Sequence, residues 1–230
     1  MVDLESYKRQ AAEHALQYIQ SGMTLGLGTG STATHMLRAL AQALQDGRLR
    51  DIVGVPTSDA IAALARQLGV QVATLDERPR LDLALDGADE IDPSLNLIKG
   101  LGGALLREKI VEASADRFIV LADETKLVAQ LGTRAPLPVE VVRFGLPLAT
   151  RRLTELGGVP VLRRVADGSP FRTDEGHVIL DCRFAGIPDS AALNAAINAI
   201  PSVVEHGLFV GMASIALVGG AAGVATMVRS

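Results

Sequence analysis

The apolar positions of this chain recur with two spacings that alternate along it. The first stretch, residues 4–20, has the spacing of an amphipathic helix. Its apolar stripe consists of Ala11, Ala12, Ala15, Leu16 and Ile19. Beyond residue 23, short apolar runs typical of strands alternate with longer segments of helical spacing. Because parallel strands need crossover connections, this order predicts an open, mostly parallel sheet covered by helices on both faces.

The predicted elements of this first α/β domain follow one another as far as residue 122. Predicted strands cover residues 24–28, 52–56, 70–75, 81–86, 96–99 and 118–122. Predicted helices cover residues 32–45, 59–68 and 104–115.

The pattern changes near residues 132–138, where two prolines follow a glycine, and a domain boundary is expected there. Beyond it the prediction is strand 139–142, helix 147–156, strands 160–165 and 178–184, helix 190–199 and strand 203–209. This βαββαβ order predicts a smaller, ferredoxin-like α+β domain. The last apolar run, 214–218, is expected to rejoin the first sheet. The predicted domains are therefore residues 1–131 with 210–230, and residues 132–209.

Composition excludes several classes of protein. Hydrophobic residues make up 48% and charged residues 21% of the 230 residues, which is typical of a globular protein. The formal net charge of −4 and the lack of a basic stripe argue against a nucleic-acid partner. No apolar run reaches the roughly 20 residues of a bilayer span, so a cytoplasmic protein is expected. The single cysteine, Cys182, cannot form an internal disulfide and is expected to be a packed residue.

A glycine-rich segment, Gly28-Thr29-Gly30-Ser31-Thr32-Ala33, lies between the first predicted strand and a helix. Its glycines can adopt positive φ, and the N–H groups of the helix N-terminus can hold an anion beside the hydroxyls of Ser31 and Thr32. The letters also match a dinucleotide fingerprint, but the second strand lacks the acidic residue that a ribose needs. A Walker loop is excluded because no Gly-Lys-Ser/Thr follows. A phosphate site is favoured, and a simple helix cap is the alternative.

Three carboxylates, Asp86, Asp89 and Glu90, crowd the turn after the strand predicted at residues 81–86. Crowding disfavours full ionisation, so one carboxyl group can exchange protons with a hydroxyl near neutral pH. Taken alone, such a turn is more often a polar turn that caps local backbone groups.

A lysine and a glutamate flank the next glycine-rich turn. Lys99 ends a predicted strand, and the glycines that follow let the backbone approach a ligand before the next helix begins. Glu108 lies about one turn into that helix, near its positive end. A single helical glutamate is more often a solvated residue.

The remaining candidate groups give weaker signals. Lys8 and Lys126 could each pair with an anion, although such lysines are usually surface residues. The four histidines have no metal-ligand spacing, and one cysteine cannot build a zinc cluster, so no metal site is expected. Ser31 and Ser58 lack the context of a nucleophile elbow, which argues against a serine hydrolase.

Taken in order, these motifs closely resemble ribose-5-phosphate isomerase of the A type. The resemblance rests on residues 28–33, on Asp86-Gly87-Ala88-Asp89-Glu90-Ile91, on Lys99 to Ala104 with Arg107 to Ile110, and on Phe118 to Asp123 with Lys126. Residues 136–141, 198–201 and 207–209 extend it into the second domain. Leu101 departs from the family pattern, which usually has a glycine there.

The resemblance implies interconversion of ribose 5-phosphate and ribulose 5-phosphate without a cofactor. It implies that Glu108 moves a proton between C1 and C2, that Asp86 and Asp89 handle ring opening and hydroxyl protons, and that Lys99 stabilises the enediolate oxygen. The implied substrate-binding residues are Lys8, Thr29, Gly30, Ser31, Thr32, Gly87, Ala88, Gly100, Leu101, Gly102 and Lys126. The implied fold is a Rossmann-like domain with a small α+β domain, assembled as a homodimer or a dimer of dimers.

Two other functions are less consistent with the residues. A sugar-phosphate sensor would keep the phosphate loop but could lose Glu108 or Lys99, and it would carry a helix-turn-helix segment. An isomerase or deaminase of amino-sugar phosphates would want a histidine in a catalytic loop, where neither His14 nor His35 lies.

Overall fold

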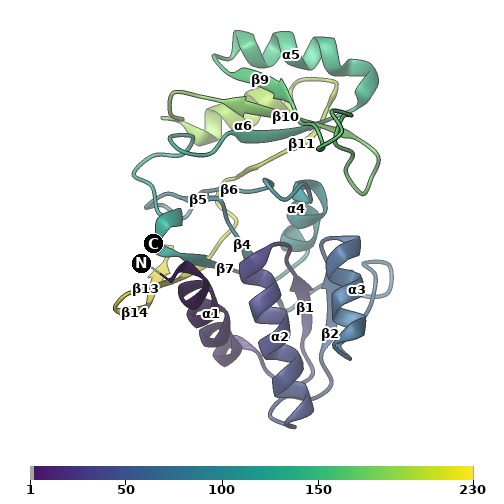
Figure 1. Ribbon diagram of the computed structural model, residues 1–230, viewed down its shortest axis with the longest axis vertical. Coiled ribbons are helices and arrows are strands. Elements are labelled where there is room, and N and C mark those ends of the chain that lie inside the picture. Colours follow the sequence, from purple (N-terminus) through teal and green to yellow (C-terminus); the bar gives the residue numbers. More distant parts are fainter. Residues whose placement is uncertain (1–2, 230) are drawn as a thin grey trace. The chain divides into compact units, whose positions relative to one another are not determined.

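Three sheets organise the computed structural model, which describes residues 3–229 (Figure 1). The chain divides into two compact units. The first unit holds Met1–Ala88, Arg107–Lys126 and Gly211–Ser230, and the second holds Asp89–Leu106 and Leu127–Val210.

The first unit contains a seven-stranded sheet with the order β14-β13-β7-β4-β1-β2-β3. The strands are β1 (Thr24–Leu27), β2 (Val53–Pro56), β3 (Gln71–Val72), β4 (Leu83–Gly87), β7 (Phe118–Asp123), β13 (Ile215–Gly220) and β14 (Gly223–Val228). All neighbours are parallel except β13 and β14. The strand order reverses between β1 and β4, and such a switch point is where open α/β sheets usually bind ligands.

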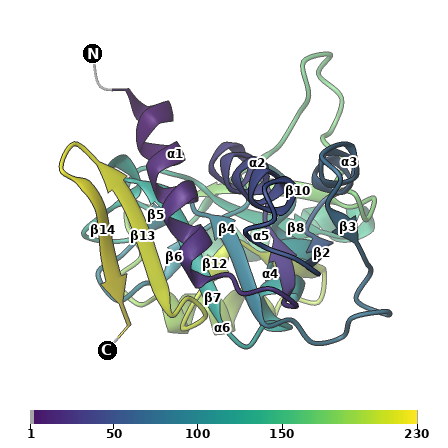
Figure 2. The same ribbon diagram turned by 90° about the horizontal axis from the view of Figure 1, so that it is seen from below.

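Helices cover both faces of this sheet (Figure 2). The helices are α1 (Leu4–His14), α2 (Ser31–Gln45), α3 (Asp59–Gln67) and α4 (Leu105–Ala113). Leu25 and Leu27 of β1 pack with Met36 of α2 in one buried cluster. Gly26, between those two leucines, faces the other way, where an added Cβ would lie 2.7 Å from Val111 of α4. Strand alternation therefore places α2 and α4 on opposite faces.

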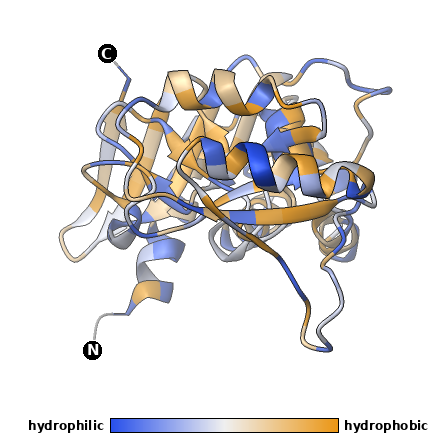
Figure 3. Ribbon diagram, turned by 90° about the horizontal axis from the view of Figure 1, so that it is seen from above, coloured by the Kyte–Doolittle hydropathy of each residue, from blue (hydrophilic) through white to orange (hydrophobic). Residues whose placement is uncertain are grey.

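The second unit contains an antiparallel four-stranded sheet with the order β11-β8-β10-β9. Its strands are β8 (Leu137–Val141), β9 (Val159–Leu162), β10 (Val178–Arg183) and β11 (Val203–His206). Helices α5 (Leu146–Glu155) and α6 (Ser190–Asn198) bury Leu153 and Ile197 against Val139 and Leu180. In Figure 3 the helices nearest the viewer carry both hydrophobic and hydrophilic residues. The predicted ferredoxin-like βαββαβ order is confirmed.

A small three-stranded sheet completes the second unit, with the order β12-β6-β5. Its strands are β5 (Glu90–Ile91), β6 (Leu97–Ile98) and β12 (Leu208–Phe209), and both pairings are antiparallel. The strand predicted at residues 96–99 for the large sheet lies here instead, as β6, because it pairs with β5 and β12. Strand β5 was not predicted, since it is only two residues long.

Two further predictions about elements were wrong, and one strand was missed. Residues 203–209 form two strands, β11 and β12, because the segment pairs with β8 before Gly207 and with β6 after it. A side chain at Gly207 would overlap the carbonyl oxygen of Lys99. The first helix ends at His14 and continues as a 3₁₀ turn, η1 (Ala15–Tyr18). Strand β14, which was not predicted, lies at the edge of the sheet and is mostly exposed.

The compact units differ from the predicted domains in their boundaries. Residues 89–106 and 127–131 belong to the second unit, although the sequence placed them in the larger domain. The reason is the pairing of β5 with β6 and of β6 with β12, which ties residues 89–98 to the second unit.

Cys182 is fully buried in the core of the second unit, and burial raises the pKa of its thiol to about 12. It is thus a packed residue, as expected. Among residues 3–229, no helix combines the length and apolar character that a membrane crossing needs.

Candidate active site

The first candidate group lies at the switch point of the first unit. Strand β1 runs into the glycine-rich loop, and the neighbouring strand β4 ends with Asp86 and Gly87. The N–H of Gly28 donates to the carbonyl of Leu85 at 3.0 Å, and a Cβ at Gly28 would overlap the carboxyl group of Asp86. Asp86 is only 1% exposed, and its Oδ1 accepts the N–H of Gly87 at 2.6 Å. The structure therefore brings the loop and the first carboxylate together.

Thr29 braces the loop from within. Its hydroxyl lies 2.7 Å from that of Thr57 and 2.9 Å from that of Ser58, both in the loop that follows β2. Ser58 also caps α3 by accepting the N–H of Ile61. The hydroxyl of Thr29 thus joins two neighbouring loops.

Gly30 and the first turn of α2 form the part of the loop that was predicted to bind an anion. Gly30 has φ +113°, a conformation that favours glycine, and it caps α2 without a side chain. Ser31 is exposed and Thr32 is nearly buried. An uncapped helix N-terminus presents backbone N–H groups and a positive dipole end, which suits a phosphate.

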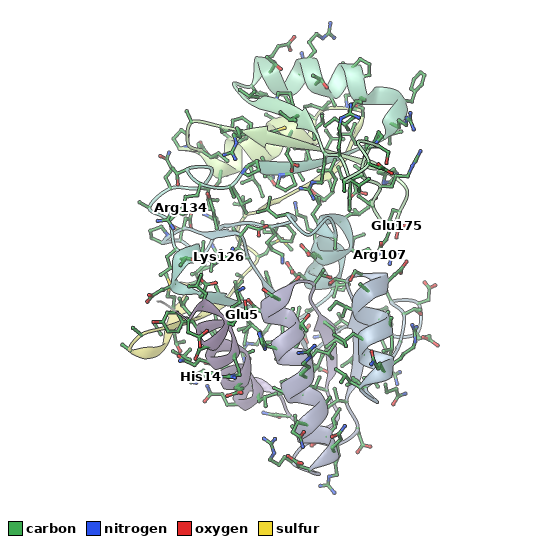
Figure 4. All side chains as sticks on the ribbon, in the orientation of Figure 1. Glu5, His14, Arg107, Lys126, Arg134 and Glu175 are labelled. Carbon is green, nitrogen blue, oxygen red and sulfur yellow. The ribbon has the colours of Figure 1, made fainter. Side chains whose placement is uncertain are left out.

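Lys8 of α1 is connected to α2 through the carboxylate of Glu5, which contacts both Lys8 and His35. Its Nζ is 2.6 Å from Glu5, which is labelled on α1 in Figure 4, and the other oxygen of Glu5 is 3.0 Å from Nε2 of His35 on α2. Hydrogen bonds from His35 and Lys8 lower the pKa of Glu5 to about 2. Lys8 is thus held against α1 while Glu5 connects it to the second turn of α2.

Glu108 occupies the first turn of α4 and is only 3% exposed. Its neighbour Arg107 pairs with Asp59 of α3 at 2.7 Å. Glu112, one turn further along α4, is equally buried. Sequence analysis did not single out Glu112, although its spacing of four residues from Glu108 places both carboxylates on one face of the helix.

Lys126 follows β7, the strand next to β4, at the same carboxyl-end edge of the sheet. It ends the 3₁₀ turn η2 (Glu124–Lys126) and is half-buried (Figure 4). Buried Asp123 shapes this turn by accepting the N–H and the hydroxyl of Thr125.

The second candidate group lies in the three-stranded sheet of the second unit. Pairing of Glu90 with Ile98 places Asp89 opposite Lys99, and the N–H of Asp89 donates to the carbonyl of Ile98 at 2.8 Å. The Oδ2 of Asp89 accepts the N–H of Leu101 at 3.0 Å. Lys99 is 2% exposed, and its Nζ lies 5.4 Å from the centre of the Phe209 ring. Asp89, Lys99 and the turn 99–103 are thus brought together.

Glu90 does not act with Asp86 and Asp89 as the crowded turn suggested. It is fully buried, and its carboxylate accepts backbone N–H groups from Gly132, Arg134 and Ala135 at 2.6, 2.7 and 2.6 Å. Glu90 therefore holds residues 132–135 in place, more than 40 residues along the chain, which differs from the local capping considered for the acidic turn.

Leu101 fits the turn without the glycine that the family pattern has there. Its backbone is not among the positive-φ residues of the described chain, and its side chain is 42% exposed. The turn needs glycine at Gly100 and Gly103, which have φ +98° and +89°.

Within residues 3–229, no group of three or more His, Cys, Asp or Glu side chains is arranged to hold a metal ion. The chain is thus an α/β protein with a doubly wound sheet, a glycine-rich loop at its switch point and a second, ferredoxin-like unit. Residues 53–223 match the family model of ribose 5-phosphate isomerase A, phosphoriboisomerase A. The chain belongs to this family.

Individual relatives agree over the full length. The chain is 64% identical to ribose-5-phosphate isomerase A of Roseiflexus sp. strain RS-1, over 97% of this chain and 96% of that protein. It is 54% identical to the enzyme of the same name from Synechococcus sp. strain JA-3-3Ab, over 100% of both chains. A solved ribose 5-phosphate isomerase from Plasmodium falciparum has a TM-score of 0.95 and 38% identity, covering 99% of this chain and 100% of its own.

The contact between Gly28 and Asp86 generates a prediction. We expect Gly28→Ala to lower kcat/KM for ribose 5-phosphate by about 10²-fold, because the new methyl group displaces the Asp86 carboxyl. Steady-state kinetics measure the effect. Gly22→Ala is the matched control, since Gly22 has φ +89° and open space around it, so that variant adds backbone strain without moving Asp86. Equal kinetics for the two variants would contradict the prediction.

Proposed function

We propose that this chain interconverts D-ribose 5-phosphate and D-ribulose 5-phosphate through an enediol(ate) intermediate, as a step of the non-oxidative pentose phosphate pathway. Buried Glu108 carries the proposal, because it places a carboxylate, a group able to accept a proton, in the first turn of the helix that follows Lys99 and its glycine-rich turn. A solved D-ribose-5-phosphate isomerase in complex with phospho-erythronic acid adds support, with a TM-score of 0.96 and 41% identity over 99% of this chain and all of its own.

The reaction needs three kinds of group. A base must move a proton between C1 and C2, a cation must stabilise the developing oxyanion, and an acid must serve the sugar hydroxyls. In the proposal, Glu108 is the base and Lys99 is the cation. Asp86 and Asp89 handle ring opening and the hydroxyl protons. Because these residues supply every group the reaction needs, the proposal includes no cofactor and no metal.

Substrate binding is assigned to the loops around these groups. The backbone and hydroxyls of Gly30, Ser31 and Thr32 hold the phosphate at the N-terminus of α2. Thr29 contributes its backbone, since its hydroxyl already joins two loops. Lys8 adds a positive charge. The sugar contacts are assigned to Gly87, Ala88, Gly100, Leu101, Gly102 and Lys126.

The proposal extends to assembly and location. The second unit exposes Phe144, Val159 and Val161, at 96%, 64% and 61%, which supports its use in a homodimer or a dimer of dimers. The protein is proposed to work in the cytoplasm.

Purified protein is expected to isomerise ribose 5-phosphate after exhaustive chelation, at the same kcat as before chelation. A coupled assay for ribulose 5-phosphate measures the rate. Binding of ribose 5-phosphate without turnover would indicate a sensor and contradict the proposal. Activity that disappears on chelation and returns with added metal would contradict its metal-free part.

Replacing Glu108 by Gln keeps the shape of the side chain but removes its ability to accept a proton. We expect kcat to fall by about 10²- to 10⁴-fold while the substrate still binds, and uptake of solvent deuterium at C1 or C2 to slow in parallel. Glu112→Gln, equally buried one turn away, is the matched control. If Glu112→Gln loses exchange while Glu108→Gln keeps it, the base has been assigned to the wrong carboxylate.

The phosphate loop is tested by removing two hydroxyls. Ser31→Ala combined with Thr32→Val should raise KM about tenfold and change kcat little, because phosphate is held alike in the ground and transition states. Thr34→Val, at the next threonine of α2, is the control. A normal KM combined with a collapsed kcat would remove the loop from phosphate binding.

A further inference from the structure

The long connection between β9 and β10 reaches back to the turn at residues 99–103. It leaves the sheet as an extended loop that carries Glu175 (Figures 2 and 4). Its first residue, Arg163, keeps strand pairing by donating its N–H to the carbonyl of Ile179 at 2.9 Å. Its guanidinium is directed at a different part of the second unit.

The Arg163 guanidinium binds two targets at once. Its Nε and Nη2 make a bidentate pair with Asp181, at 2.9 and 2.5 Å. Its Nη1 donates to the carbonyls of Gly100 and Leu101, at 3.2 and 3.0 Å. The pair is largely buried, with 13% of the Arg163 side chain exposed. Asp181 on β10 therefore holds the Arg163 guanidinium in one orientation, and the guanidinium in turn holds two successive peptide groups.

The peptide geometry determines what this contact does to the turn. In a trans peptide, the carbonyl and the next N–H point in opposite directions. Because the carbonyl of Gly100 points at Arg163, the N–H of Leu101 points away, and it donates to Asp89 at 3.0 Å. The same rule turns the N–H of Gly102 away from the guanidinium. Arg163 thus orients the donors of the turn toward the side on which Asp89 lies.

A second contact from the same connection closes on the end of the turn. The ring of Phe171 lies against Gly103, where an added Cβ would be 2.5 Å from the ring. The Arg163 guanidinium lies 5.6 Å from the centre of this ring, and the N–H of Phe171 donates to the carbonyl of Arg163 at 2.9 Å. The turn is therefore held at Gly100, Leu101 and Gly103 by one connection.

The far end of the connection is anchored as well. Buried Glu140 of β8 accepts the hydroxyl of Thr173 at 2.8 Å and lies 2.9 Å from Nδ1 of His177. A connection fixed at Arg163 and again at Thr173 holds Phe171 between two rigid points.

We propose that Arg163, held by Asp181, is a positioning residue that sets the backbone of the 99–103 turn and so the place of Lys99 in the reaction. It touches no reacting atom in this proposal, which rests on the proposed function. Misplacing a catalytic group by about 1 Å can cost about 10²-fold in rate, so loss of Arg163 should reduce kcat.

Arg163→Met is compared with Arg164→Met as the matched control. Arg164 is the next arginine of the same connection, and its guanidinium donates to Gly168 within that connection at 2.6 Å. Arg163→Met should lower kcat by about 10- to 100-fold with little change in KM, and Arg164→Met should stay close to wild type. Arg163→Lys keeps a charge beside Asp181 but cannot also bind two carbonyls, so it tests the same point if Arg163→Met fails to fold.

Hydrogen exchange separates positioning from general destabilisation. The proposal expects faster exchange in a peptide that covers residues 99–103, and unchanged exchange in one that covers β10. An equal rise in both peptides, or a wild-type kcat in a folded Arg163 variant, would overturn it. Wild type and Lys99→Met are measured alongside. If the wild type does not isomerise ribose 5-phosphate, the proposed function fails, while hydrogen exchange still decides whether Arg163 holds the turn.

Discussion

The contact between Gly28 and Asp86 is the constraint on which the first unit depends. Strand order reverses between β1 and β4, so the loops that follow these strands diverge to opposite faces of the sheet. At that point the backbone of Gly28 lies directly on the Asp86 carboxyl, and no side chain fits between them. The carboxyl is thereby buried next to a helix N-terminus. In the proposed function, this arrangement places the phosphate loop and a buried acid at one point of the sheet.

In the second unit, the backbones of two segments, at Lys99 and at Gly207, approach each other closely. One run of residues pairs first with β8 and then with β6, and it changes sheets at Gly207. The N–H of Lys99 donates to the carbonyl of Gly207 at 2.9 Å, and Phe209 lies beside the Lys99 ammonium. Glycine at the crossing allows the two backbones to meet, and the ring offers the buried cation a favourable surface.

Buried charges in this protein fall into two kinds. Glu90 accepts three backbone N–H groups and Arg163 is paired with Asp181, so these charges stabilise the arrangement of the chain. Asp86, Glu108 and Lys99 are also buried, and they lie at the end of β4, in the first turn of α4 and directly after β6. Burial of charge at such places costs stability and is typical of sites that carry chemistry.

The sequence by itself determined the order of the elements, the two kinds of sheet and the motifs that identify the family. It could do so because periodic apolar positions and glycine-rich turns depend on local backbone geometry, as in Gly28 to Thr32 and in Lys99 with Gly100. It also indicated Glu108, although spacing alone left that residue open to a solvated role. Only the tertiary structure showed that Glu90 binds backbone N–H groups and is not grouped with Asp86 and Asp89. It also showed that Glu112 is buried, and that residues 203–209 form two strands divided at Gly207. It alone connected Arg163 with Gly100, 63 residues away. These features depend on contacts between distant segments, and no local pattern of side chains records which distant backbone a residue will meet.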